Sequence, residues 1–421
     1  MTSQNNQLTS NSILRFSYSF ILSGIIVIAG SLFTCCTETT ENVSISRYPA
    51  GYDFAFTITD DPDEGRIEQK KAVYDYLDSI GMKISIGVWV FNNKRGSGNL
   101  SYYDQGISLE NDEFLQYVRR LKEKGFELFV HTVSGGNDLR QETISGFHAY
   151  QRYFGAYPEH WVNHFTNFEN IYWGYKRFNN PVMSFLYKTF KTDQFSGDDQ
   201  HNQYFWGDYC QKYIKYVRGW ATPDINTLKF NPSMPYHDPN KPYVRFWYAC
   251  SDGANREMFN RLISRENVDR LIREKGTSII YTHFASGFVD KNGTLNEETA
   301  ELLRYLASHN NGWFVPVNVI LDRFIAIRSI KIYEDDDRYL LVNTSGKTIE
   351  NIAVEVRDKD GVLYKDMRYK PMVDAPSIIT LDKLPGNTSI SLLKISPGTK
   401  RFIPFKERVR LSASWLLSRF Y

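Results

Sequence analysis

The sequence has little net charge, few cysteines and no internal repeat. Lys and Arg together number 50 against 48 Asp and Glu, which leaves a formal net charge of +2 in 421 residues. A chain this close to neutrality has no broad basic field, which argues against nucleic acid as a partner. The hydrophobic fraction of 42% excludes a wholly disordered chain and a polytopic membrane protein. At roughly 100 to 200 residues per domain, the length predicts two or three globular domains.

Only four cysteines occur, and two of them are adjacent to an N-terminal apolar run. The other two, Cys210 and Cys250, lack the CxxC spacing of a thiolate metal site. In an oxidising compartment they could form one disulfide, and the alternative is a pair of buried, reduced thiols.

Residues 1–36 have the pattern of an export signal. Arg15 is the only charge before the apolar run at 16–33, and Cys35 follows that run almost directly. The stretch LFTC resembles a bacterial lipoprotein processing box, which implies cleavage before Cys35 and lipid modification of that cysteine. The alternative is an uncleaved anchor helix. Both place the rest of the chain in the cell envelope, outside the cytoplasm, with the polar residues 37–48 as a tether to the membrane.

Between residues 49 and 328, short apolar runs alternate with amphipathic stretches of helical length. Strands are predicted at residues 52–59, 82–90, 126–131, 161–164, 213–217, 244–248, 277–283 and 313–315, and helices at 67–80, 111–124, 256–275 and 296–309. This alternation over ~270 residues predicts a parallel α/β architecture, and a barrel is the closed form that it favours.

The pattern changes after residue 328. Residues 329–396 contain short alternating strands with turn signals and no helical period, which predicts a small antiparallel β-sandwich domain. Residues 397–421 form a basic, aromatic tail, for which we expect an amphipathic helix that packs on the body of the protein or lies on a membrane surface.

Candidate chemical groups stand where the predicted strands end. In a parallel α/β barrel, functional side chains collect at the carboxyl ends of the strands. The first predicted strand ends in an acidic run and three later strands end at or near histidines: Asp60, Asp61 and Asp63, then His131, His164 and His283. The alternative for the acidic run is a turn that caps the next helix, and the alternative for each histidine is a structural role.

Two of these motifs resemble those of the polysaccharide deacetylase superfamily, whose members remove acetyl groups from N-acetylated sugars. FAFTITDDPD resembles the first family motif, which implies Asp60 as the general base and Asp61 as a metal ligand. EKGTSIIYTHFASGF resembles the last motif, which implies His283 as the general acid. The resemblance covers about residues 50–325 and implies a deacetylase-like, distorted β/α barrel.

The middle motif departs from the family pattern, which is two histidines one helical turn apart. FVHTVSGG supplies His131 but has Gly135 at the second position. A catalytic zinc site needs three protein ligands and a water, so another ligand must replace the missing histidine. We expect His164 in HWVNHF to be that ligand, because it closes the next predicted strand.

Other residues are candidates for substrate binding. Asn163, and Asn167 near it, could orient a ligand or bind sugar hydroxyls. Trp220 is one of several tryptophans near predicted strand ends that could stack on a sugar ring, and its alternative is a place in the core. For the family's cleft arginine, the sequence offers Arg152 and Arg218.

The leading hypothesis is therefore an exported, metal-dependent hydrolase that removes acetyl groups from an N-acetylated glycan. Its cofactor would be a divalent metal, zinc first, although imidazole and carboxylate ligands also suit cobalt, nickel or iron. Its partners would be the glycan and, through the N-terminal segment, a membrane. Two alternatives remain open. One is a non-catalytic glycan-binding or envelope-scaffold protein on a degenerate barrel, and the other is a glycosidase or amidase on the same barrel.

Overall fold

A computed structural model describes residues 42–93, 106–165, 167–190, 194–336, 338–357, 362–364 and 377–394. The predicted export segment at 1–36 and the C-terminal tail at 397–421 lie outside the described residues. Within the described part of the chain, no helix has the length and apolarity needed to span a membrane.

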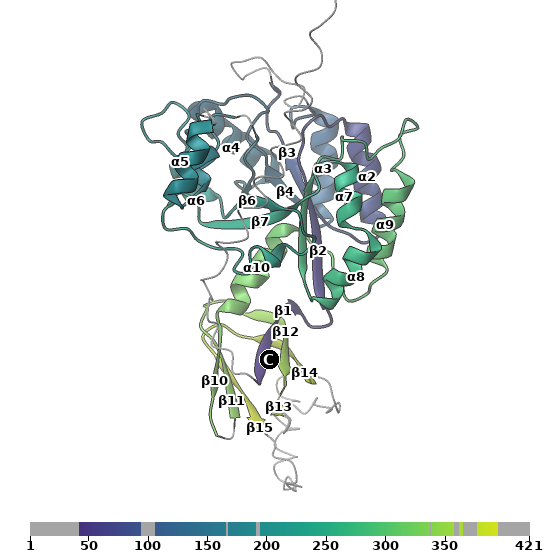
Figure 1. The fold of residues 1–421 in the computed structure, drawn as a ribbon, viewed down its shortest axis with the longest axis vertical. Coiled ribbons are helices and arrows are strands. Elements are labelled where there is room, and N and C mark those ends of the chain that lie inside the picture. The colour runs from purple at the N-terminus through teal and green to yellow at the C-terminus, as the bar shows by residue number, and fades with distance from the viewer. Residues whose placement is uncertain are drawn as a thin grey trace, which may run out of the picture. The chain divides into compact units, whose positions relative to one another are not determined.

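Parallel strands form a closed barrel in the described part of the chain (Figure 1). The ring runs in the order β2 (Phe54–Asp60), β3 (Ser85–Val88), β4 (Glu127–Val130), β5 (His160–Trp161), β6 (Tyr216–Thr222), β7 (Phe246–Asp252) and β8 (Thr277–Thr282). It closes because β2 pairs with both β8 and β3, and β9 (Gly312–Trp313) adds to β2. Each connection between neighbouring parallel strands must return the chain to the opposite end of the barrel. Helices on the outside of the ring make these crossovers.

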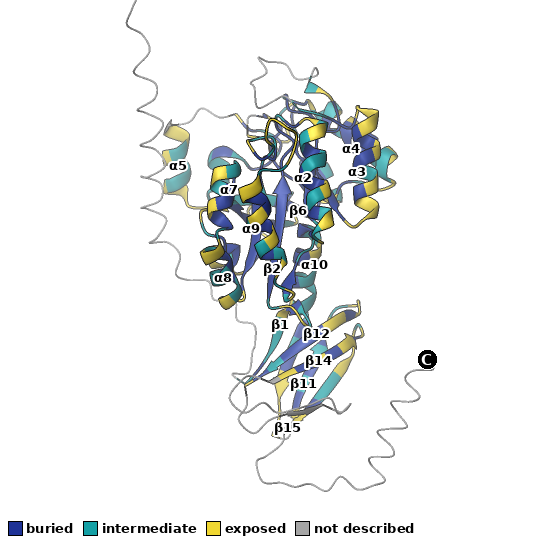
Figure 2. Ribbon diagram, turned by 90° about the vertical axis from the view of Figure 1, so that its right-hand side faces the viewer, coloured by how far each residue is buried: buried dark blue, intermediate teal, exposed yellow. Residues whose placement is uncertain are grey.

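Helices surround this barrel, and each of them except α5 (Pro181–Phe190) has buried residues on one side. They are α2 (Ile67–Ser79), α3 (Asp112–Glu123), α4 (Arg140–Phe154), α5 (Pro181–Phe190), α6 (Gly207–Tyr213), α7 (Arg256–Leu262), α8 (Arg265–Arg273), α9 (Glu297–Ala307) and α10 (Val317–Arg328), with short 3-10 turns η4 (Gly174–Arg177) and η5 (Thr227–Lys229). Figure 2 shows strands that are buried and helices whose outer faces are exposed. The stretch 256–275, predicted as one helix, is two helices because the Ser264 side chain caps a new one.

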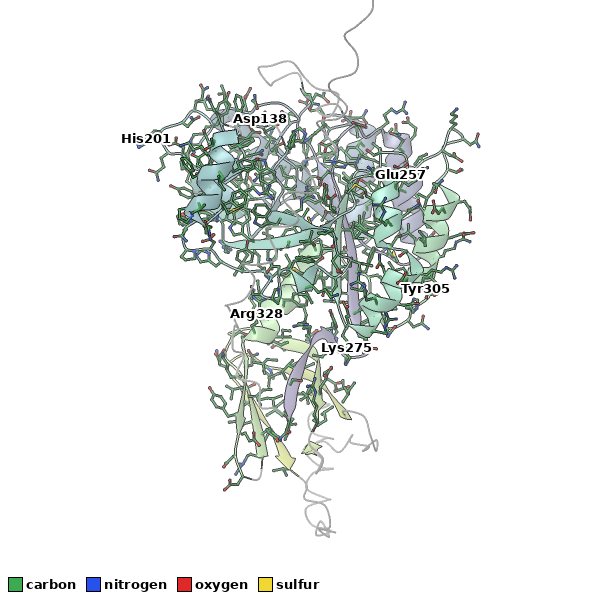
Figure 3. All side chains as sticks on the ribbon, viewed as in Figure 1. Asp138, His201, Glu257, Lys275, Tyr305 and Arg328 are labelled. Atoms are coloured by element: carbon green, nitrogen blue, oxygen red, sulfur yellow. The ribbon has the colours of Figure 1, made fainter. Side chains whose placement is uncertain are left out.

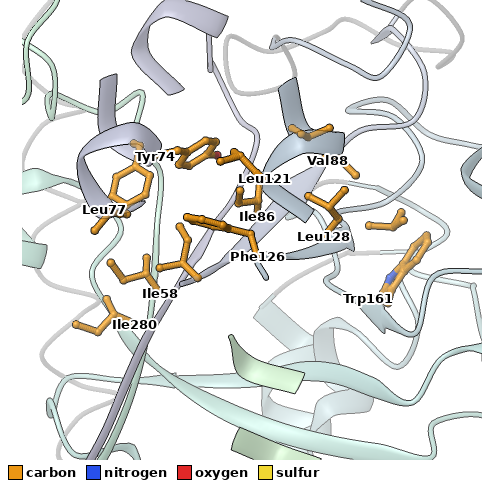
Figure 4. Close-up of a cluster of buried hydrophobic side chains, with 14 of the residues drawn as sticks. Ile58, Tyr74, Leu77, Ile86, Val88, Leu121, Phe126, Leu128, Trp161 and Ile280 are labelled. Carbon is orange, nitrogen blue, oxygen red and sulfur yellow. The ribbon is translucent and has the colours of Figure 1, made fainter. Parts of the chain in front are cut away.

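Strand β2 decides which side chains face the helices and which face the barrel interior. Successive side chains of a strand point to opposite faces. Phe54, Phe56 and Ile58 belong to the hydrophobic cluster that contains the inner face of α2, part of which is drawn in Figure 4. Ala55 belongs to a different cluster, with residues from β6, β7 and α10. The next residue in the helix-facing series is Asp60.

The C-terminal residues form two antiparallel sheets. One has the order β1 (Val43–Pro49), β12 (Ile349–Val356) and β14 (Ser377–Leu384), and the other β10 (Ile330–Glu334), β11 (Arg338–Asn343), β15 (Ser389–Lys394) and β13 (Val362–Tyr364). Side chains from both sheets share one hydrophobic cluster. The predicted fold class, a β/α barrel followed by a small antiparallel β domain, is confirmed.

Strand β1 differs from the sequence-based prediction, which made residues 37–48 a tether. Val43–Pro49 pairs with β12, and Val43 is buried in the cluster of the β domain. The partner strand lies about three hundred residues away in the sequence, so no local pattern could show that this polar-looking segment would be paired.

The two cysteines of the body, Cys210 and Cys250, are both free and buried. Burial raises the pKa of each thiol, to about 12 for Cys250. Both therefore remain protonated near neutral pH and act as small apolar side chains.

Candidate metal centre

The barrel brings the predicted histidines together with two aspartates. His131 directly follows β4, His283 directly follows β8, and His164 lies three residues beyond β5. Asp61 and Asp63 follow β2. All of these segments leave the same end of the barrel. In Figure 3 this is the end at which Asp138 lies, and Lys275, which precedes β8, lies at the opposite end. This is the end at which parallel barrels place functional groups.

Asp63 lies at the centre of the group. Its Oδ1 is 3.5 Å from His131 Nε2 and 3.4 Å from His164 Nε2, and its Oδ2 is 2.9 Å from His283 Nε2. The rings of His131 and His164 are 5.2 Å apart and nearly perpendicular. Asp63, His131 and His164 each offer one ligand atom within 4.8 Å of the others. The three residues therefore converge on one small volume.

The Asp63 carboxylate fits a cation. Its Oδ1 is buried and accepts no hydrogen bond from the described residues. Burial alone would raise the pKa of Asp63, but the charges of His131 and His164 outweigh burial and hold the pKa well below its usual range. A buried, ionised carboxylate needs a positive charge beside it, and either protonated histidines or a metal ion held by neutral histidines can supply that charge. One carboxylate oxygen and two imidazole nitrogens are also the ligand types of a catalytic zinc site.

His164 is oriented by a residue behind it. Its Nδ1 lies 2.8 Å from Asn167 Oδ1, so Nδ1 donates and Nε2 keeps its lone pair toward Asp63. The Asn167 amide nitrogen donates to the backbone oxygen of Ser134 at 3.1 Å and to Glu169 Oε1 at 2.6 Å. Asn167 thereby connects the segment after β4 to the segment after β5.

Asp138 and Glu169 form a buried acidic pair behind Asn167. The backbone N–H of Asp138 donates to Glu169 Oε2 at 3.2 Å, and the Asp138 carboxylate accepts from the N–H and hydroxyl of Ser134. Burial raises the pKa of Asp138 to about 7, and burial together with the charge of Asp138 raises the pKa of Glu169 well above its usual range. The pair therefore holds a proton at a pH where exposed carboxylates have none.

Asp61 is held by Arg218 of β6. Arg218 Nη1 donates to Asp61 Oδ1 at 2.8 Å and Nη2 to Oδ2 at 2.5 Å. Burial alone would raise the pKa of Asp61, but the charges of Arg218 and His131 lower it on balance. Asp61 Oδ2 is 3.9 Å from His131 Nε2 and 3.9 Å from His283 Nε2. Asp61 is therefore an ionised carboxylate at the edge of the metal centre.

Asp60 lies elsewhere, in the layer between β2 and α2. Lys70 Nζ donates to its Oδ2 at 2.8 Å, the Tyr74 hydroxyl donates to the same oxygen, and the backbone N–H of Phe284 donates to Oδ1 at 2.8 Å. The side chains of Asp60 and Lys70 are both 0% exposed. The contacts of Asp60 are those of a structural ion pair, although the sequence predicted it as the general base.

His283 contacts the other carboxylate oxygen of Asp63, Oδ2, whereas His131 and His164 face Oδ1. Its Nδ1 lies 2.7 Å from the backbone oxygen of Ala254, and its Nε2 faces Asp63. Burial alone would lower the pKa of His283, but the hydrogen bond and charge of Asp63 raise it to about 9. His283 therefore carries a proton near neutral pH.

The two predicted substrate residues have different surroundings. Asn163 is buried, accepts from the Trp161 indole at 3.0 Å and donates to the backbone oxygen of Ile171 at 3.0 Å, so its contacts hold a loop. Trp220 is half-buried near the end of β6, where its ring packs against Phe178 and Arg177.

A pocket of about 590 Å³ is lined by residues that follow those of the centre in the sequence. Its lining includes Glu64, which follows Asp63, and Ala285, two residues after His283, together with the glycines Gly65 and Gly106. The pocket therefore borders the segments that carry Asp63 and His283.

The sequence missed a role for Asp63, although Asp63 stands in the acidic run. The available signal was the alternation along β2, in which Phe54, Phe56 and Ile58 predict a helix-facing side for Asp60 and the opposite side for Asp61. Arg218 was one of two alternatives for the cleft arginine, and the structure places it on Asp61.

A comparison with family models finds no match, and a comparison with curated proteins finds none. Among solved structures, the chain is similar to Puue allantoinase, at 10% identity and a TM-score of 0.40 over 66% of this chain and 93% of that chain. It is also similar to a probable polysaccharide deacetylase from Pseudomonas aeruginosa PAO1, at 10% identity and a TM-score of 0.38 over 66% of this chain and 93% of that chain. A third similar structure is a family 4 acetyl xylan esterase from Clostridium thermocellum in complex with a cobalt ion. Its identity is 14% and its TM-score 0.31, over 64% of this chain and 90% of that chain. At these identities and TM-scores, the likenesses carry no family, residue role or substrate to this chain.

Proposed function

We propose that the protein is a metal-dependent hydrolase that removes acetyl groups from an N-acetylated glycan. The observation that carries this proposal is the buried Asp63 Oδ1, which has no hydrogen-bond donor among the described residues and faces the Nε2 atoms of His131 and His164. A buried carboxylate oxygen usually has a hydrogen-bond partner, and a bound cation would satisfy this one.

Asp63, His131 and His164 would hold the metal. A divalent ion bound by them would supply Lewis-acid chemistry for hydrolysis of the acetyl group. His164 is prepared for this role because its Nδ1 donates to Asn167 Oδ1, which fixes the tautomer whose Nε2 carries a lone pair. Zinc fits two imidazoles and one carboxylate, and cobalt, nickel and iron fit them as well.

Asp61 would act as the general base. Its lowered pKa keeps the carboxylate ionised, and the two hydrogen bonds from Arg218 fix its orientation. A carboxylate held in this way can accept the proton of an attacking water at Oδ2, the oxygen nearest to His131 and His283.

His283 would act as the general acid. Its Nε2 faces the centre while Nδ1 is anchored on Ala254, and the charge of Asp61 favours the protonated ring by raising its pKa. Donation of the Nε2 proton to the leaving amine nitrogen would complete the hydrolysis.

This assignment shifts two roles along the chain. The sequence resemblance gave the base to Asp60 and the metal to Asp61, whereas the geometry supports Asp61 and Asp63. The shift follows from Asp60 facing α2, where Lys70 and Tyr74 occupy its carboxylate.

The test is release of acetate from N-acetylated oligosaccharides by the purified chain. The proposal predicts release with added zinc or cobalt, its loss after chelation, and its return when metal is restored. Asp61→Asn should abolish release without loss of bound metal. Oligosaccharide binding without release under any metal would instead favour the binding-protein alternative, and cleavage of the glycan chain would favour a glycosidase.

The place of this activity is a separate part of the proposal. The apolar run at 16–33 and the cysteines after it support export and attachment to a membrane of the cell envelope, where glycans are accessible. Globomycin-type inhibition of lipoprotein processing should leave a longer precursor in the cell, and an unchanged chain length would contradict lipid attachment.

A further inference from the structure

The residue Arg177 is enclosed by two tryptophans. Its guanidinium carbon lies 4.2 Å from the ring centre of Trp173 and 3.8 Å from that of Trp220. Trp173 precedes η4, Arg177 ends η4, and Trp220 lies near the end of β6. Two such close contacts cover the guanidinium with indole rings, and they leave the N–H groups at its edge as the groups that can bind a partner.

Arg177 has no acidic partner among the residues that the structure describes. The neighbouring Lys176 donates to both carboxylate oxygens of Asp198, at 3.0 and 2.9 Å, and Arg218 holds Asp61. None of the described hydrogen bonds or ion pairs includes Arg177, although Lys176 and Arg218 are both paired.

The surroundings of Arg177 disfavour its positive charge. Burial lowers its pKa to about 10, and the positive charge of Arg218 adds to this effect. Arg177 remains protonated near neutral pH, in a half-buried position between apolar rings. A cation in this setting is stabilised when an anion is bound to it.

The clamp is held in place, and Trp220 shares strand β6 with Arg218. Asp198 accepts from the backbone N–H of Tyr172 at 3.2 Å as well as from Lys176, so it fixes both ends of the turn that carries Trp173. Trp220 stands two residues after Arg218, whose guanidinium binds Asp61. A group bound at Arg177 would therefore belong to a substrate whose reacting part lies at the centre.

We propose that Arg177, clamped between Trp173 and Trp220, is a subsite for an oxyanion substituent of the substrate, so that the enzyme prefers acidic glycans. This inference rests on the proposed function, because it names the class of glycan that the same site would take. The shared chemistry is a carboxylate or a sulfate ester, as in uronic acids or sulfated sugars. Either can accept two parallel hydrogen bonds from the edge of a guanidinium.

The indole rings also favour a sugar over a free anion. Aromatic faces beside a bound oxyanion can stack on the apolar face of the sugar ring that carries it. A lysine at this position would keep the charge, but it would lose the planar fork and the stacking on both rings.

The test is calorimetric titration of the purified, metal-loaded chain with three oligosaccharides of equal length. One contains a uronic acid, one a sulfate ester, and one is N-acetylated and neutral. We expect tighter binding of one or both acidic oligosaccharides, and the preferred one identifies the source of the oxyanion. Arg177→Gln should weaken that binding by roughly 10-fold or more and leave the neutral oligosaccharide unaffected.

Lys188→Gln is the matched control. Lys188 is an exposed cation of α5 that lies over the ring of Tyr175, so its removal changes the local charge without changing the clamp. This variant should bind all three oligosaccharides as the parent does. If Arg177→Gln does not fold, Arg177→Lys serves in its place, with an intermediate loss for the acidic oligosaccharide.

Equal binding of acidic and neutral oligosaccharides by the parent, or an unchanged affinity in the Arg177 variants, would overturn the subsite. These outcomes differ from a failure of the proposed function. Deacetylation of neutral glycans without any acidic preference would overturn the subsite alone, whereas binding of acidic glycans without release of acetate would overturn the hydrolase and leave the subsite standing.

Discussion

The guanidinium of Arg218 binds both carboxylate oxygens of Asp61, at 2.8 and 2.5 Å. Arg218 comes from β6 and Asp61 from the segment after β2, so the pair spans the barrel mouth. A planar fork can fix the plane of a carboxylate, which a single ammonium group cannot do.

Arg218→Lys should therefore lower kcat/KM for acetate release by roughly 100-fold, because small misplacement of a reacting group has an effect of that order. Bound metal should remain. Arg152→Lys is the control, since Arg152 was the other candidate for the cleft arginine and has no described contact with the centre. An equal loss in both variants would contradict the role of the Arg218 pair.

The buried pair of Lys70 and Asp60 predicts a change in stability. Lys70→Met would leave the Asp60 carboxylate buried without its cation, so the free energy of unfolding should fall by about 3 to 5 kcal/mol. Denaturant unfolding measures this. The adjacent Lys71 is the control, because its side chain is 33% exposed and Lys71→Met should change stability by no more than about 0.5 kcal/mol.

The double variant Asp60→Asn with Lys70→Met separates the two possible roles of Asp60. Removal of both charges should restore most of the stability lost in Lys70→Met, since no buried charge is left unpaired. The folded double variant should still release acetate. Complete loss of activity in the folded protein would show that Asp60 is the base after all.

The acidic pair behind the centre predicts a pH dependence of stability. The pKa of Asp138 is raised from 3.8 to about 7 on folding, so its protonated form is favoured in the folded state. The associated stability is present below about pH 4 and is lost as the pH rises through about 7, with a slope of at most about 1.4 kcal/mol per pH unit.

Asp138→Asn should therefore gain stability relative to the parent between pH 5 and 8. Thermal unfolding at several pH values measures the difference. Glu123→Gln, at an exposed position of α3, should leave the pH slope as it is in the parent. A parallel pH dependence in Asp138→Asn and the parent would contradict the raised pKa.

Much of the barrel could be predicted from the sequence because its signals are local. Apolar runs of strand length alternate with amphipathic helical stretches, and the wall of the barrel needs only that alternation. The same logic predicted that His131 and His164 would meet, because they follow successive strands. The structure brings the two rings to 5.2 Å from each other.

The division of roles among the aspartates was predictable in principle. Phe54, Phe56 and Ile58 share one face of β2, and a period of two places Asp60 on that face and Asp61 on the other. The family resemblance matched the order of residue types in the motif and took no account of which face of β2 each aspartate occupies. A shift by one residue moves a side chain to the opposite face of the strand.

Contacts between loops could not be predicted. Asp138 and Glu169 are 31 residues apart, and Trp173 precedes a 3-10 turn whereas Trp220 lies near a strand end. Such segments carry no hydrophobic period, and only the closed barrel brings them together.

The most direct test of this account is the metal content of the purified chain and of two single variants, measured after zinc loading and removal of free metal. We expect about one metal per parent chain, loss of that metal in Asp63→Asn, and its retention in Asp60→Asn. Retention of metal in Asp63→Asn together with its loss in Asp60→Asn would contradict the centre described here, and a parent chain without metal would contradict the hydrolase itself.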